Sequence, residues 1–202
     1  MSHNTWLHRI SRAVIVRPLL NTSVKPNQLT AARLATGIAA AATMASGRHE
    51  FMMAGAAVFG LSMLFDRADG DLARIRGETS SRGHTFDLYS DAICNALIFV
   101  GLGIGLRGGA SGDWAFVMGL IAGASVAIIL SMVLRVENRD GERAAELNGK
   151  VGFDPDDAML AVPVAVWLGA HQELLYAAAV GTPFFAVIFF VVFRNKLGST
   201  AH

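Results

Sequence analysis

Apolar residues fall into long blocks along the chain, separated by short polar or charged stretches. A helix needs about 20 mostly apolar residues to cross the hydrocarbon core of a bilayer. Blocks 29–47, 114–134 and 174–193 are close to that length. Blocks 51–65 and 92–106 reach it if their helices continue into the acidic stretch between them, to residue 74 and back to residue 83. The pattern therefore predicts five membrane-spanning helices.

A sixth block, 158–170, is short but follows a helix-start signal. Residues 154–157, which read Asp-Pro-Asp-Asp, offer an N-cap residue, a proline at the first helical position and acids in the first turn. We therefore predict an all-α integral membrane protein with six transmembrane helices.

The first residues predict an amphipathic helix that lies on the membrane surface. Apolar side chains recur at helical spacing from Trp6 to Val14, with basic side chains between them. Arg17 and Pro18 interrupt the apolar run and no cleavage site follows, so the segment lacks the pattern of a signal peptide. The expected organisation is an N-terminal interfacial helix and lead-in over 1–27, a six-helix membrane domain over 28–196 and a C-terminal tail over 197–202.

The amino-acid composition supports an integral membrane protein. The 202 residues are 53% hydrophobic and 16% charged, whereas soluble domains carry about 25% charged residues. The net charge of +1 gives no overall basic field for binding nucleic acid. Cys94 is the single cysteine, so an internal disulfide is excluded.

The basic residues predict the orientation. With six spans, every Lys and Arg except Arg48 and Arg107 falls on the side that also holds both termini. Cytoplasmic loops are rich in Lys and Arg. We therefore expect both termini on the cytoplasmic side, in a bacterial inner membrane.

Four carboxylates lie where a membrane helix should be apolar. Asp66 and Asp69 are three residues apart, and Asp87 and Asp91 are four apart on the next helix. A short loop, about 75–82, joins the two helices, so we expect them to be antiparallel neighbours. Their acidic ends would then lie at one depth, just inside the cytoplasmic edge.

Such carboxylates need compensation, because each costs roughly 2.5–3.5 kcal/mol toward the centre of a span and they repel one another. They can protonate, as in a proton relay, or bind cations. Four carboxylates would balance two divalent ions, and oxygen ligands suit Mg²⁺, Mn²⁺ or Ca²⁺. Paired divalent ions are a common arrangement for phosphoryl transfer. Simple neutralisation of Asp66 and Asp69 by Arg67 and Arg74 is the structural alternative.

Small residues accompany the acids. Gly70 within a helix costs about 1 kcal/mol relative to alanine, but it lets a ligand approach the backbone. Ala73 keeps the same face small, and Arg74 is placed to contact a phosphate. A face of small residues equally serves close helix packing, so both interpretations stay open.

The spacing resembles a known family. Asp66-x-x-Asp69-Gly70-x-x-Ala73-Arg74, followed by Gly83, Asp87 and Asp91, is similar to the pattern of the CDP-alcohol phosphotransferases, with eight specified residues over 26 positions. Pro26, Asn27 and Thr30 resemble the Pro-Asn-x-x-Thr element that opens the first span of many members.

This resemblance implies an activity and a site. In the family, an alcohol hydroxyl attacks the β-phosphate of a CDP-linked donor and CMP leaves. The implied ligands of two divalent cations, Mg²⁺ or Mn²⁺, are Asp66, Asp69, Asp87 and Asp91, with Asp91 also the general base. The implied CDP-binding residues are Asn27, Thr30, Asp69, Gly70, Ala73, Arg74 and Gly83. The expected partners are CDP-diacylglycerol, a small polar alcohol, the lipid bilayer and a second copy of the chain.

More than one interpretation is open for the acceptor site and for the function. A phosphorylated acceptor would need a basic anchor, for which Arg135 and Arg139 are the candidates, followed by Arg143 and Lys150. Positive-inside residues are the simpler interpretation of all four. The rival functions are a phosphotransferase that uses another CDP-alcohol donor with a lipid acceptor, a divalent-cation or proton-coupled transporter, and an inactive scaffold.

Overall fold

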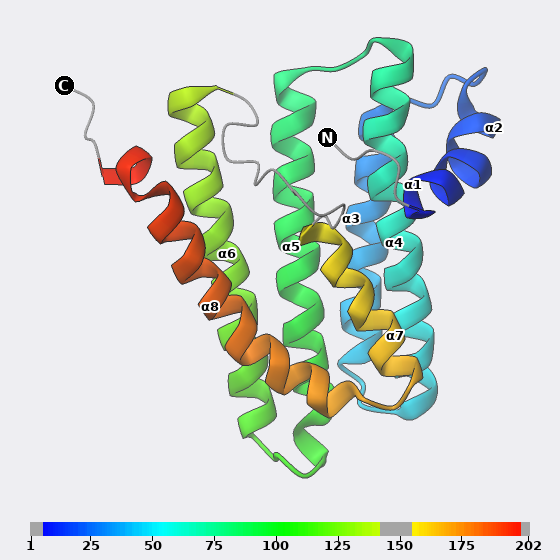
Figure 1. Cartoon of the computed structure of the whole chain (residues 1–202). Coiled ribbons are helices and arrows are strands. Elements are labelled where there is room, and N and C mark those ends of the chain that lie inside the picture. Colours follow the sequence, from blue (N-terminus) through cyan, green and yellow to red (C-terminus); the bar gives the residue numbers. More distant parts are fainter. Residues whose placement is uncertain (1–5, 142–154, 199–202) are drawn as a thin grey trace.

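The computed structural model describes residues 6–141 and 155–198, which form helices and no β-strand (Figure 1). The N-terminal part contains α1 (Trp6–Ser11), the π-helical turn η1 (Arg12–Val16) and α2 (Arg17–Leu19). The bundle contains α3 (Pro26–Met44), α4 (His49–Arg76), α5 (Ser81–Gly105), η2 (Leu106–Gly108), α6 (Trp114–Asp140), η3 (Pro155–Leu160), α7 (Ala161–Trp167) and α8 (His171–Gly198).

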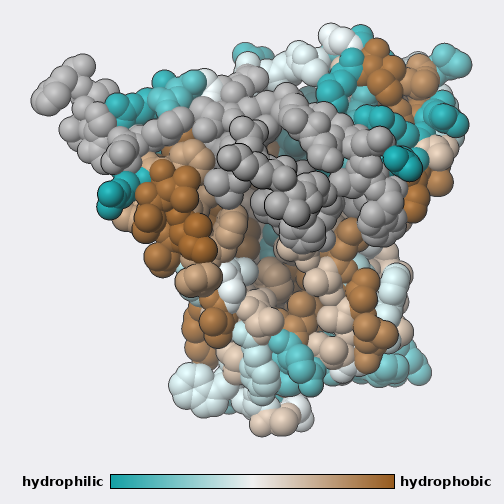
Figure 2. Space-filling view, viewed as in Figure 1, coloured by the Kyte–Doolittle hydropathy of each residue, from teal (hydrophilic) through white to brown (hydrophobic). Residues whose placement is uncertain are grey.

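Among the described residues, four helices are long and apolar enough to cross a membrane: His49–Arg76, Ser81–Gly108, Trp114–Asp140 and His171–Arg194. Figure 2 shows brown hydrophobic side chains on the flanks between more hydrophilic upper and lower edges, as expected for a protein embedded in lipid. The fold is therefore that of an integral membrane protein. The count of six spans stays a prediction, because α3 and α7 do not meet the same test.

α3 is long enough to span a bilayer but carries polar residues in its first half. It packs against both α4 and α5, and its polar side chains Thr30 and Arg33 are buried. α4 and α5 do not pack closely against each other along their length. The expectation that they are direct neighbours is therefore wrong, because α3 lies against both and brings their acidic ends together.

Local signals set the ends of α3, α4 and α5 near the acids. Pro26 occupies the first turn of α3, and the Lys25 N–H donates to Gln28 Oε1 over 2.9 Å. α4 ends at Arg76, and the following Gly77 adopts the left-handed conformation with φ of 68°. α5 begins at Ser81, where the Ser80 hydroxyl accepts from the Gly83 N–H over 3.1 Å. The predicted extension of both apolar blocks into the acidic stretch is confirmed.

The short sixth block starts differently from the prediction. A 3-10 helix covers Pro155–Leu160, and α7 begins only at Ala161. Pro163 has no N–H to donate to residue 159, and it lies in the first turn of α7, where no such hydrogen bond is needed. The predicted N-cap, Asp154, lies outside the described residues.

The N-terminal helices lie against α4, at the end of the bundle that also holds the α4–α5 connection (Figure 1). The Ser11 hydroxyl donates to the carbonyl of Leu64 over 3.0 Å, and Val16 is buried. Ile10 and Val14 are exposed on the outside. A helix is thus present where the sequence predicts one, and its position at a membrane surface stays a prediction, as does the division at residues 27 and 196.

Close approach of α3 to α5 depends on Gly101. A Cβ at this position would overlap the backbone carbonyl of Ala41. Substitution therefore requires the helices to separate. By contrast, a Cβ at Gly60 of α4 would meet nothing within 4 Å.

We predict that Gly101→Ala lowers the free energy of unfolding by about 1–3 kcal/mol, as expected for overpacking. Thermal unfolding of the purified protein in detergent measures this. Gly60→Ala is the matched control and should leave stability unchanged or raise it by up to about 1 kcal/mol, because alanine favours helix. Equal unfolding temperatures for the two variants would contradict the close contact.

Candidate functional site

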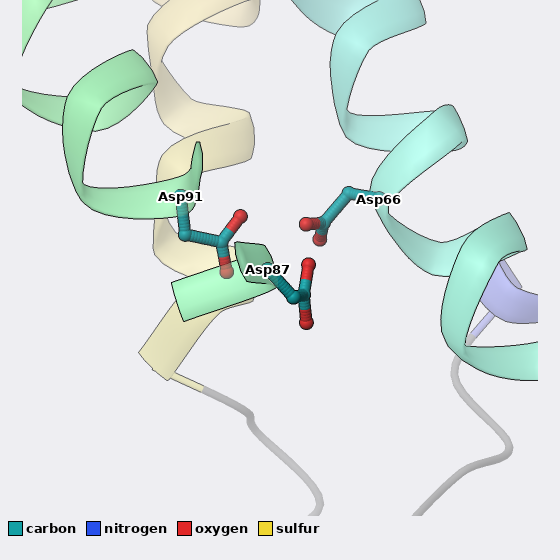
Figure 3. Close-up of side chains that lie close together, drawn as sticks. All are labelled: Asp66, Asp87 and Asp91. Carbon is teal, nitrogen blue, oxygen red and sulfur yellow. The ribbon is translucent and has the colours of Figure 1, made fainter. Parts of the chain in front are cut away.

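Three of the four predicted metal ligands lie together. Asp66 of α4 and Asp87 and Asp91 of α5 each offer one carboxylate oxygen, and these oxygens lie within 4.8 Å of one another (Figure 3). Opposite ligands around an octahedral Mg²⁺ are about 4.2 Å apart, because each bond is about 2.1 Å. An all-oxygen donor set of this size fits a hard divalent cation.

A buried arginine from α3 joins this cluster. Arg33 Nε donates to Asp66 Oδ1 over 2.7 Å and to Asp91 Oδ1 over 2.5 Å, and Nη2 of the same side chain pairs with Asp91. Arg33 Nη1 donates to Ser62 Oγ over 3.2 Å, and that hydroxyl donates back to the Arg33 carbonyl over 3.0 Å. The side chain is only 3% exposed. Arg33 is thus an integral part of the carboxylate cluster.

From the sequence, Arg33 is expected only as one of the basic residues on the cytoplasmic side of the membrane. The available signal was its position three residues after Thr30, on one face of the same helix. Thr30 was already a candidate for the site. A basic residue on that face, one turn deeper in the membrane, needs an acidic partner.

Arginines also change the charge balance of the acids. Asp66 Oδ2 accepts from Arg67 Nη1 over 2.8 Å, so each oxygen of Asp66 accepts a hydrogen bond from an arginine. Arg74 instead pairs with Asp71, at 2.6 Å. Neutralisation of Asp66 by Arg67 is therefore observed alongside the cluster. The four acids carry less uncompensated charge than the sequence suggested.

Asp69, the fourth predicted ligand, has a different environment. The Thr30 hydroxyl donates to Asp69 Oδ2 over 2.5 Å, and both side chains are buried. Asp69 is absent from the group formed by Asp66, Asp87 and Asp91. It lines an adjoining cavity instead, as Asp87 also does.

This cavity has a volume of about 280 Å³ and lies between the first turn of α3, the end of α4 and the start of α5. All seven residues that the resemblance assigned to CDP binding line it: Asn27, Thr30, Asp69, Gly70, Ala73, Arg74 and Gly83. The remaining wall is mostly polar and includes Ser80, Ser81, Thr79 and His84. The structure thus gathers residues from three helices around one polar cavity beside the acids.

The glycines of the cavity wall lie against polar side chains, and the contact is tight only at Gly83. A Cβ on Gly70 would lie 3.6–3.8 Å from the guanidinium atoms of Arg74, so this guanidinium lies over the glycine. A Cβ on Gly83 would come within 3.1 Å of Ser80 Oγ and 3.2 Å of Asn27 Oδ1. At these two positions the close contacts are with polar side chains of the cavity wall and not with another helix backbone.

The predicted acceptor residues lie elsewhere. Arg135 and Arg139 are exposed on α6 and do not line this cavity. Arg143 and Lys150 lie outside the described residues. His84 of the cavity wall reaches α6, where its Nε2 lies 2.9 Å from Glu137 Oε2. An anchor for the acceptor on α6 stays a prediction.

Comparison with known proteins gives three findings. A family model described as CDP-alcohol phosphatidyltransferase matches residues 23–192. A bifunctional IPC transferase and DIPP synthase of Rubrobacter xylanophilus is 40% identical over 87 residues, which cover 43% of this chain and only 19% of that protein. A crystal structure of Mycobacterium tuberculosis phosphatidylinositol phosphate synthase with CDP-DAG bound has a similar fold, with a TM-score of 0.63 and 24% identity over 94% of this chain and 92% of that chain.

We predict that Arg33→Met lowers the free energy of unfolding by about 3–5 kcal/mol, because removing one partner of a buried ion pair leaves buried carboxylates without their counter-charge. Thermal unfolding with and without Mn²⁺ measures this. Added Mn²⁺ should raise the unfolding temperature more in Arg33→Met than in the unchanged protein.

Arg33→Lys is the matched control for charge. It keeps the positive charge and loses the planar fork, so its destabilisation should be smaller than that of Arg33→Met. If Arg33→Met unfolds at the same temperature as the unchanged protein, the arginine does not balance the acids.

Proposed function

Because the chain belongs to the CDP-alcohol phosphatidyltransferase family, we propose that it transfers the phosphatidyl group of CDP-diacylglycerol to the hydroxyl of a small polar alcohol, releasing CMP. Such a reaction belongs to phospholipid biosynthesis. The observation that carries the proposal is the three-carboxylate cluster beside a polar cavity lined by all seven expected CDP-binding residues. The structural neighbour from Mycobacterium tuberculosis, which was crystallised with CDP-DAG, supports the choice of donor. Family membership argues against the transporter alternative.

The acids would hold divalent cations, which we propose to be Mg²⁺ or Mn²⁺. Asp66, Asp87 and Asp91 offer the converging oxygens, and Asp69 is the further ligand that a second ion would need. When bound, a divalent cation offsets negative charge that develops on the diphosphate. Arg33 holds Asp66 and Asp91 in place, which keeps these carboxylates oriented before an ion arrives.

The cavity would bind the CDP part of the donor. Its arginine, Arg74, supplies a guanidinium fork suited to a phosphate. Its amide and hydroxyl groups, from Asn27 and the serines of the α4–α5 connection, can form hydrogen bonds with a polar nucleotide. The acyl chains of the donor would remain in lipid, because the exposed flanks of the helices are apolar (Figure 2).

Asp91 is the proposed general base. A base must lie within hydrogen-bonding reach of the hydroxyl whose proton it accepts. Asp91 belongs to the carboxylate cluster, and its side chain is 25% exposed, so an acceptor can approach it. Hydrogen bonds from Arg33 hold the Asp91 carboxylate in a fixed orientation within the cluster.

The location and assembly follow from the same proposal. The site lies at the end of the bundle where the basic residues gather, so we place it on the cytoplasmic side of a bacterial inner membrane. The N-terminal helices would lie on that surface, with Ile10 and Val14 facing lipid. A homodimer and a phosphate-binding role for Arg135 and Arg139 complete the proposal.

CMP release tests the reaction directly. The purified protein, given CDP-diacylglycerol, Mg²⁺ or Mn²⁺ and a panel of polar alcohols with and without phosphate, should release CMP with at least one acceptor. Excess EDTA should abolish this release, and added Mn²⁺ should restore it. If no CMP forms with any acceptor or with another CDP-linked donor, the proposed function is wrong.

We predict that Asp91→Asn lowers turnover at least 100-fold, in line with the typical contribution of general acid–base catalysis. Binding of CDP, measured by calorimetry, should remain within about threefold, because Asp91 does not line the cavity. Asp113→Asn is the matched control, since Asp113 is 85% exposed and lies in the connection between α5 and α6, at the opposite end of the bundle from the α4–α5 connection (Figure 1). Near-normal turnover in Asp91→Asn would remove Asp91 from the role of base.

A further inference from the structure

A buried carboxylate outside the family pattern lies directly beside the cavity. Asp71 of α4 follows Gly70 and is only 1% exposed. It pairs with two arginines from different parts of the chain. Arg12 of η1 donates from Nε to Asp71 Oδ2 over 2.6 Å and from Nη2 to Oδ1 over 3.2 Å. Arg74 Nη2 donates to Asp71 Oδ1 over 2.6 Å.

These contacts fix Arg74, the one arginine that lines the cavity among residues 6–141 and 155–198. The guanidinium of Arg74 is tied at one end to Asp71 and lies over Gly70. One third of its side chain is exposed, and it lines the cavity. A long side chain held in one orientation loses less conformational entropy when it binds a ligand. Asp71 therefore holds the Arg74 guanidinium in one orientation before an anion binds.

Arg12 compensates for the negative charge that Asp71 places beside Arg74. A carboxylate that paired with Arg74 alone would cancel its charge and weaken its attraction for a phosphate. Here two guanidinium groups share one carboxylate, so the group of Arg12, Asp71 and Arg74 keeps a net positive charge at the cavity wall. The bidentate contact of Arg12 also holds the Asp71 carboxylate in a single orientation.

Arg12 reaches Asp71 because the N-terminal segment is anchored on α4. The hydrogen bond from Ser11 to Leu64 precedes Arg12, and the buried Val16 follows it. Val16 packs in one cluster with Ala68 and Leu72, which flank Asp71 on α4. The N-terminal segment is thus placed to act on the cavity as well as on the membrane surface.

We propose that Asp71 and Arg12 are positioning residues for Arg74, which makes the N-terminal segment part of the binding site for the diphosphate of the donor. The proposal rests on the proposed function only in identifying the anion as the diphosphate of a CDP-linked donor. Asp71 and Arg12 act through Arg74 and do not themselves touch the donor.

Calorimetric titration of CDP into the full chain in lipid nanodiscs, with Mg²⁺ present, tests the proposal. Arg12→Ala and Asp71→Asn should each weaken CDP binding about tenfold, the loss expected when a charge-assisted hydrogen bond no longer holds the guanidinium. Arg12→Lys should recover part of the affinity, because it keeps the charge but not the bidentate contact. Arg17→Ala is the matched control, since Arg17 is an exposed arginine of the same segment, and it should bind CDP as the unchanged protein does.

A double-mutant cycle separates positioning from general stability. In an Arg74→Ala background, Arg12→Ala should have no further effect on CDP affinity, because Arg12 influences the ligand only through the Arg74 side chain. An equal loss in both backgrounds, or no loss in either, overturns the proposal. If Arg12→Ala does not fold, the same cycle is run with Arg12→Lys, whose smaller loss should also vanish in the Arg74→Ala background.

CDP binding by the unchanged protein distinguishes failure of the proposed function from failure of the positioning role. If the unchanged protein neither binds CDP nor releases CMP, the proposed function is wrong, and this inference with it. If the unchanged protein binds CDP and the Arg12 and Asp71 variants bind it equally well, only the positioning role is wrong.

Discussion

The buried guanidinium of Arg33 is the contact on which the arrangement of the site depends. It joins α3 to Asp66 of α4 and Asp91 of α5 at a level where little water is available to solvate a charge. Each of these charges would be costly alone, and their mutual hydrogen bonds offset that cost only in one geometry. The three helices are therefore held in a single register. That register places the carboxylates together and opens the cavity beside them.

Small residues make this arrangement sterically possible. Gly101 lets α5 approach the backbone of α3, and Gly37 leaves room for Cys94 and Ser62 near Arg33. At the cavity, a Cβ on Gly83 would crowd Ser80 Oγ and Asn27 Oδ1, whereas a Cβ on Gly70 would make ordinary contact with Arg74. Glycine thus permits close helix packing in the interior of the bundle and close contact of polar side chains at the cavity.

The carboxylates were accessible from the sequence because they sit at fixed spacing within single helices, whereas the cavity residues were expected from the resemblance to the family. Asp66 and Asp69, or Asp87 and Asp91, share a face wherever a helix forms. Arg33 was missed as part of the site because its partners Asp66 and Asp91 are 33 and 58 residues away in the chain, and the pairing of Asp71 with Arg12 was missed because the two are 59 residues apart. No local pattern encodes such pairs. The place of α3 against both acidic helices was missed for the same reason.

The sequence by itself determined the class of protein, the main helices, the family and the residues around the cavity, because hydrophobic blocks and short-range spacing act within one helix. Only the tertiary structure decided which carboxylates converge, that Asp69 turns to Thr30, and which arginine balances which acid. Those outcomes depend on the relative position of separate helices. Burial makes each unpaired charge so costly that helix packing and charge pairing must be satisfied together.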